Sequence, residues 1–114
     1  MSTLSVENKY TDDIASGNTL TDLSEVLASG KRMKLEKVGC CAPVGSDGVD
    51  AVIKLEWGDD ENGWEVIRML SKTIEVLLDR ILDGDGAKRL KLTRNNPSDS
   101  TKEVFAYYSY VKET

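Results

Sequence analysis

The chain has 114 residues, of which 39% are hydrophobic and 31% charged, with 20 acidic against 15 basic side chains. This length fits one domain and this balance is typical of a folded chain, so we expect a single domain over residues 1–114. A net charge of −5 repels duplex nucleic acid, so no direct nucleic-acid partner is expected. The longest charge-free stretch, residues 38–46, is too short for a membrane helix, so no membrane partner is expected.

The absence of histidine limits the chemistry open to this chain. Serine–histidine and cysteine–histidine nucleophile pairs are excluded, as are histidine metal sites. The only cysteines, Cys40 and Cys41, are adjacent and too few for a four-ligand zinc site. A bond between neighbours would strain the backbone, so we expect two free, partly buried thiols and a reducing compartment. We therefore expect no catalytic residue, no cofactor and no metal site.

Residues 1–27 are polar and rich in turn-forming residues, with a few apolar anchors. We predict one or two short strands or a docking arm there, ahead of a core over residues 28–112. Residues 31–42 alternate Met33 and Leu35 with charged side chains, which predicts a half-buried strand with a bulge near Val38–Cys40. A loop is predicted at residues 43–48.

Residues 49–57 show the clearest strand pattern, because every second residue is apolar and the others include Lys54 and Glu56. An acidic hairpin loop is predicted at residues 58–63. Residues 64–82 fit two structures. Their apolar residues fall at helical spacing, but β-branched residues and a turn-like Ser71-Lys72-Thr73 favour two strands.

Two further strands are predicted, one around Leu90 and Leu92 and one over residues 104–111, with turns at residues 83–86 and 95–100 between the apolar runs. The final strand carries apolar bulk on both faces. Seven to eight short strands at regular spacing predict an all-β, antiparallel sandwich that is jelly-roll-like. The alternative is an α+β fold with one helix at residues 64–82.

Several charged clusters have a structural interpretation. The run Asp83-Gly-Asp-Gly86 begins like a calcium loop, but Arg94 stands where the bidentate glutamate belongs. The acids Asp59, Asp60 and Glu61 are interpreted as a solvated hairpin tip. Two basic clusters are interpreted as solvated strand faces; they comprise Lys31, Arg32, Lys34 and Lys37, and Lys88, Arg89, Lys91 and Arg94.

The aromatic residues are the main candidates for a contact surface. They favour core or subunit-interface positions, since aromatic side chains dominate both. The candidate interface residues are Phe105, Tyr107, Tyr108, Tyr110 and Trp64. A sugar-stacking platform involving Trp57 and Trp64 is the alternative.

Four segments carry a resemblance that covers about three-quarters of the chain. They are residues 29–38 opening a strand, 52–57 as an inner strand, 63–67 after the acidic hairpin, and 84–92 before an Asn-rich loop. Together they resemble small jelly-roll or sandwich accessory proteins of tailed bacteriophage virions, such as capsid decoration and tail-associated proteins. The resemblance implies a non-enzymatic protein that oligomerises, possibly as a trimer, and binds a capsid or tail lattice in a virion assembled in the host cytoplasm.

Two other functions remain open at this point. A sandwich with tryptophans and an acidic loop would suit a carbohydrate-binding module. A helix at residues 64–82 packed on a sheet would suit a small acidic adaptor or inhibitor.

Overall fold

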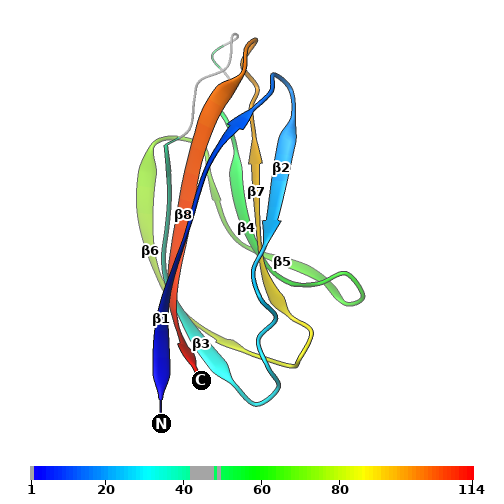
Figure 1. The fold of residues 1–114 in the computed structure, drawn as a ribbon, viewed down its shortest axis with the longest axis vertical. Helices are drawn as coiled ribbons and strands as arrows, with labels where there is room; N and C mark the ends of the chain where they lie inside the picture. The colour runs from blue at the N-terminus through cyan, green and yellow to red at the C-terminus, as the bar shows by residue number, and fades with distance from the viewer. Residues whose placement is uncertain (1, 42–47, 49) are drawn as a thin grey trace.

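The computed structural model describes residues 2–41, 48 and 50–114, and this part of the chain contains eight strands and no helix, so none that could cross a membrane (Figure 1). The strands are β1 (Thr3–Ile14), β2 (Thr19–Leu23), β3 (Arg32–Cys41), β4 (Ile53–Asp59), β5 (Gly63–Leu70), β6 (Ile74–Asp83), β7 (Arg89–Asn95) and β8 (Lys102–Glu113). The predicted loop at residues 43–48 lies outside the described residues, except for Gly48.

The strands form two four-stranded antiparallel sheets, ordered β1-β8-β3-β6 and β2-β7-β4-β5. Successive strands cross from one sheet to the other, except that β4 and β5 form a hairpin within one sheet. This is the double-sheet arrangement of a jelly roll. The prediction of an antiparallel, jelly-roll-like sandwich is therefore confirmed.

The core lies between the sheets and is built by period-two alternation. In β7 the side chains alternate between half-buried and buried, and Leu90 and Leu92 are fully buried. In β3 the same alternation buries Met33 and Leu35, and a bulge after Leu35 shifts the phase so that Val38 and Cys40 also point inward. The bulge lies slightly earlier than the predicted one.

Residues 64–82 form strands β5 and β6, joined by a turn at residues 71–73. The two-strand prediction is confirmed, and the helix alternative is wrong. Both strands lie at an edge: β5 pairs only with β4, and β6 pairs only with β3. The apolar residues on their outward sides produced the helix-like spacing, because an edge strand does not need a fully polar outer face to fit its sheet.

The N-terminal residues belong to the sandwich, so the prediction of an arm at residues 1–27 is wrong. Strand β1 pairs with β8 along its whole length, from Thr3 opposite Glu113 to Ile14 opposite Lys102, and β2 pairs with β7. The many polar residues of this segment reflect two edge strands, each with one face toward solvent.

The second basic cluster is not wholly solvated, because Arg94 is fully buried. It shares the inward side of β7 with Leu90 and Leu92, so the alternation carries it into the core. Its guanidinium donates hydrogen bonds to the carboxylates of Asp12 in β1 and Asp22 in β2, at 2.6 and 3.0 Å. A further bond reaches the carbonyl oxygen of Val104 at 2.7 Å. Arg94 therefore joins the two sheets where β1 and β2 form their edges.

Candidate interaction surface

The structure separates the aromatic residues proposed for an interface into three locations. Tyr108 and Tyr110 point inward from β8 and are 0% and 5% exposed, so they belong to the core of a single chain. Phe105 and Tyr107 lie on the outer face of the same strand and are half-buried. Trp64 lies on β5 in the other sheet. Of the five, only Phe105 and Tyr107 share a surface.

Tyr107 is the centre of a contact cluster on the outer face of sheet β1-β8-β3-β6. Its ring packs against that of Phe105, with the centroids 5.4 Å apart, and the ammonium of Lys37 lies 5.9 Å from its centroid. Its hydroxyl donates a hydrogen bond to the Glu75 carboxylate, which raises the pKa of Tyr107 to about 12. The ring lies over Gly39, where a Cβ would overlap it. An aromatic ring that covers a strand glycine in this way replaces the missing side chain.

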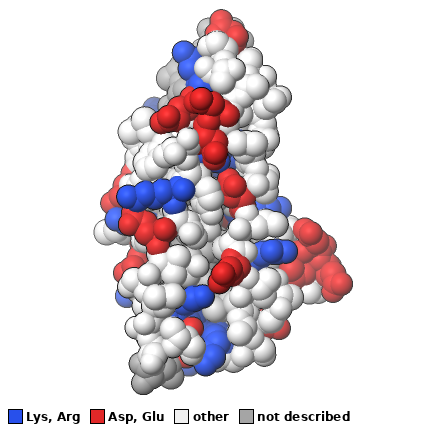
Figure 2. All heavy atoms as spheres, in the orientation of Figure 1, with Lys and Arg blue, Asp and Glu red and all other residues white. Residues whose placement is uncertain are grey.

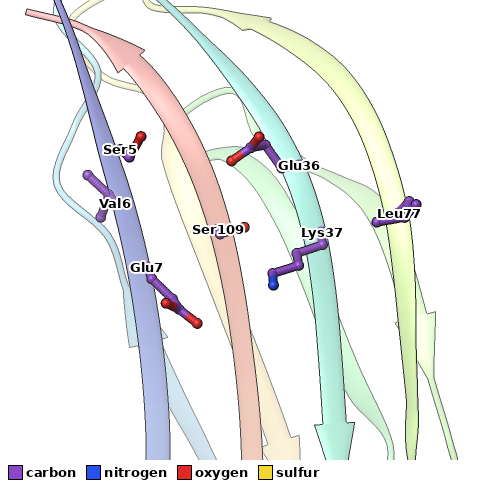
Figure 3. A pocket seen from close by; sticks show the side chains of 7 residues that line it. All are labelled: Ser5, Val6, Glu7, Glu36, Lys37, Leu77 and Ser109. Carbon is purple, nitrogen blue, oxygen red and sulfur yellow. The ribbon is translucent and has the colours of Figure 1, made fainter.

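Beside this cluster a shallow groove of about 480 Å³ crosses all four strands of the sheet, and we call it the outer-face groove (Figure 3). Its floor includes Ser109 of β8, and Glu36 and Lys37 both point from β3 toward β8. The lining residues are Ser5, Val6, Glu7, Glu36, Lys37, Leu77 and Ser109.

Two local features create the hollow. Ser109 is the one small residue in the outward row of β8, between Tyr107 and Val111. The bulge in β3 falls next to it, since Leu35 pairs with Tyr110 and Lys37 with Ser109. Glu36 is therefore the extra residue, and both it and Lys37 line the groove.

Outward from the groove, β3 and β6 carry a ladder of ion pairs. Lys37 lies 3.9 Å from Glu75, Lys34 lies 2.9 Å from Asp79, and Arg32 lies 3.6 Å from Asp83. Each pair is exposed and stabilises the fold by less than about 1 kcal/mol. Their effect on the surface is larger, because they neutralise this face within one chain.

The second notable surface is a set of exposed apolar side chains on the two edge strands β5 and β6. Of the nine large hydrophobic residues that are exposed in the described part of the chain, five lie on these strands. We call them the β5–β6 apolar strip: Val66, Met69, Ile74, Leu77 and Ile81. Leu77 is 80% exposed, the highest value in the set, and it also borders the outer-face groove.

Sequence reasoning did not identify this strip as a site. The signal was present in the excess of apolar residues over residues 64–82, which exceeded what one buried face needs. Edge strands are normally kept from associating by charge, by proline or by irregular backbone. Strand β6 has one such device, Asp79 at a φ of 48°, but its neighbours Leu77 and Ile81 stay exposed. An apolar patch of this kind on a folded chain is typical of a contact surface.

The tryptophans do not form a shared platform. Trp57 is 5% exposed and belongs to the core. Trp64 is half-buried, and the Lys91 ammonium lies 4.2 Å from its ring centroid, where it covers that face. The acidic tip beside them is the projecting β4–β5 hairpin, which coincides with the acid cluster at the right of Figure 2. Asp59 accepts hydrogen bonds from the backbone N–H groups of Asn62 and Glu61, which lowers the pKa of its carboxyl and makes it a turn-stabilising residue.

The reactive groups of the described residues are dispersed. No three Cys, Asp or Glu side chains among them are placed to hold a metal ion together. Cys40 and Cys41 are free thiols, as predicted, but only Cys40 is buried, and burial raises the pKa of its thiol. Away from the acidic tip, acids and bases alternate over the face shown in Figure 2.

Comparison with known proteins yields no assignment to a family. No family model and no curated protein sequence matches the chain. Three solved structures are similar at low scores. PirA matches at a TM-score of 0.48 and 14% identity, over 90% of this chain and 92% of that one. The *Drosophila* NLP core, described in terms of pentamer formation and histone binding, matches at 0.40 and 14%, over 90% and 96%.

The third is a chain in the structure of infectious bursal disease virus, Gx strain. It matches at a TM-score of 0.37 and 6% identity, over 94% of this chain but only 31% of the viral one. At these scores and identities, none of the three supports an inference about function.

Proposed function

We propose that this chain is a non-enzymatic assembly protein that associates with further copies of itself through the β5–β6 apolar strip. The observation that carries the proposal is the placement of five large exposed apolar side chains on two edge strands. Four other exposed hydrophobic residues are spread over the opposite side, at Leu4, Leu20, Leu23 and Val26.

The size of the strip indicates that it acts together with a neighbouring surface. Complete burial of a large apolar side chain contributes about 1.5–3 kcal/mol, and these side chains are already about half buried. Five of them therefore contribute about 5 kcal/mol, at the lower end of the roughly 4–15 kcal/mol that association costs. The ion-paired outer face of sheet β1-β8-β3-β6 adjoins the strip at Leu77 and would supply the remaining contact.

Sedimentation velocity at micromolar concentration tests the proposal. The wild-type chain should sediment as an oligomer, and the double substitution Met69→Lys with Leu77→Lys should shift it to monomer. The matched control is Leu4→Lys with Leu23→Lys, which removes two leucines of similar exposure from the opposite side with the same change of charge. A monomeric wild type, or equal loss of assembly in both double variants, would refute the proposal.

The virion placement is the narrower part of the proposal. It is supported by the resemblance to bacteriophage accessory proteins and by a jelly-roll strand order compatible with them, although a fold alone does not determine a function. We propose that the oligomer binds a capsid or tail lattice. A tagged chain that stays at the top of a density gradient, while virions from the same cells sediment, would refute this placement.

The two alternatives lose their structural basis. The carbohydrate module required Trp57 and Trp64 on one surface, and Trp57 is in the core. The adaptor required a helix at residues 64–82, where the chain forms β5 and β6. Saturable tryptophan quenching by a sugar would revive the first alternative.

A further inference from the structure

The outer face of sheet β1-β8-β3-β6 carries a protruding side chain beside a hollow. Leu77 on β6 is 80% exposed, and the groove over Ser109 lies two strands away on β8. Two copies related by a two-fold axis place the same features opposite each other in reverse order. A projection and a hollow on one face are therefore self-complementary.

We propose that two copies of this chain pack face to face, with Leu77 of each copy seated in the outer-face groove of the other. This inference rests on the self-association proposed above and identifies its geometry. The two-fold axis then passes over β3, the strand between Leu77 and Ser109.

The charges over β3 fit this axis. Glu36 and Lys37 are adjacent and both line the groove, because the bulge turns both toward the outer face. A two-fold axis between them places Glu36 of one copy against Lys37 of the other, and it does so twice. The β3–β6 ion pairs farther out are already satisfied within each chain, so the contact leaves few unpaired charges.

The available area is sufficient for a stable contact. Strands β1 and β8 have 12 residues each, which at about 3.3 Å per residue and about 4.8 Å between strands gives a four-stranded face of about 760 Å². A standard interface buries about 800 Å² on each partner. Strand addition at the free edge of β6 is less suitable, because Asp79 at positive φ interrupts its backbone.

Charge exchange between two variants tests the ion pairs. Glu36→Lys places lysines against lysines across the axis, and Lys37→Glu places glutamates against glutamates. Each variant alone should dimerise at least tenfold more weakly than wild type. An equimolar mixture should recover wild-type affinity as a heterodimer, because both opposed pairs are then of opposite sign.

A filled groove tests the packing. Ser109→Trp should weaken dimerisation at least tenfold, with an unchanged far-UV circular dichroism spectrum showing that the fold is kept. Leu77→Ala should weaken it similarly, whereas Met69→Ala, which lies in the other sheet, should not.

The outcomes separate the two levels of the proposal. A monomeric wild type refutes self-association itself. A wild-type oligomer that tolerates Ser109→Trp and shows no rescue on mixing the charge variants refutes the face-to-face geometry and leaves assembly through other parts of the strip. A wild-type trimer by sedimentation equilibrium also refutes it, because a two-fold contact closes at two copies.

Discussion

Arg94 is a buried cation whose removal we expect to cost less stability than removal of its two acidic partners. The arginine side chain is 0% exposed, whereas those of Asp12 and Asp22 are 54% and 32% exposed. Water can therefore solvate the carboxylates when the arginine is absent, but it does not reach the guanidinium when the carboxylates are absent.

The magnitudes follow from the hydrogen bonds. Arg94→Met leaves the carbonyl oxygen of Val104 without its donor, a cost of about 1–3 kcal/mol. It also removes the Nε of Arg94, a buried donor that has no acceptor in the described part of the chain, which offsets a similar amount. The net loss should be about 1 kcal/mol. The double substitution Asp12→Ala with Asp22→Ala leaves a buried, unpaired charge, and should cost about 3–5 kcal/mol.

Urea unfolding at 25 °C, followed by tryptophan fluorescence at one fixed protein concentration, measures both losses. Asp13→Ala is the matched control, since Asp13 is exposed and neighbours Asp12, and its loss should stay within about 0.5 kcal/mol. If Arg94→Met proves as destabilising as the double aspartate variant, the argument from unequal exposure is refuted.

Three further predictions concern the turn, the tyrosine cluster and the thiols. Gly58→Ala should destabilise the chain by at least about 2 kcal/mol in the same assay, because its Cβ would overlap the backbone carbonyl of Gly63, which cannot move aside. The raised pKa of Tyr107 means that its contribution to stability is complete below pH 10 and is lost as the pH rises toward 12, and Glu75→Gln should lower that pKa in a titration of tyrosinate absorbance. Cys41 should react with a thiol reagent in the folded state, while Cys40 should react only at the rate of unfolding.

Each of these has a defined contrary result. A Gly58→Ala loss no larger than that of Gly17→Ala, where a Cβ meets open space, would show that the overlap is relieved by backbone movement. An unchanged tyrosinate titration in Glu75→Gln would remove the role of that carboxylate. Equal rates of labelling for the two thiols would contradict the burial of Cys40.

Much of the strand pattern was accessible from the sequence because period-two alternation is a local property. Residues 31–42 and 49–57 show it directly, and both contain strands. Residues 64–82 obscured it, because exposed apolar residues on β5 and β6 fill positions that a solvated strand would give to polar ones. Pairing with distant strands decides that case, and no local pattern reports it.

The candidate surface shows the same division. The sequence gave the final strand two apolar faces but no means of choosing between them, and the pairing of β8 with β1 and β3 turns Tyr108 inward and Tyr107 outward. Arg94 could have been placed correctly, since it shares the parity of Leu90 and Leu92. The groove could not, because it depends on a bulge in β3 aligned with Ser109 on another strand.

The position of β8 in its sheet also has a consequence for how the chain folds. The strand formed by residues 102–113 lies between β1 and β3, so the sheet cannot close until residues about 100 positions apart have met. Ordering so long a loop is entropically costly, and sandwiches dominated by such distant pairings fold on a scale of about milliseconds to seconds. During synthesis, β1 and β3 would leave the ribosome long before the strand that joins them, with their pairing edges open. A chain that self-assembles through edge strands would need chaperone protection, or a low local concentration, during that interval.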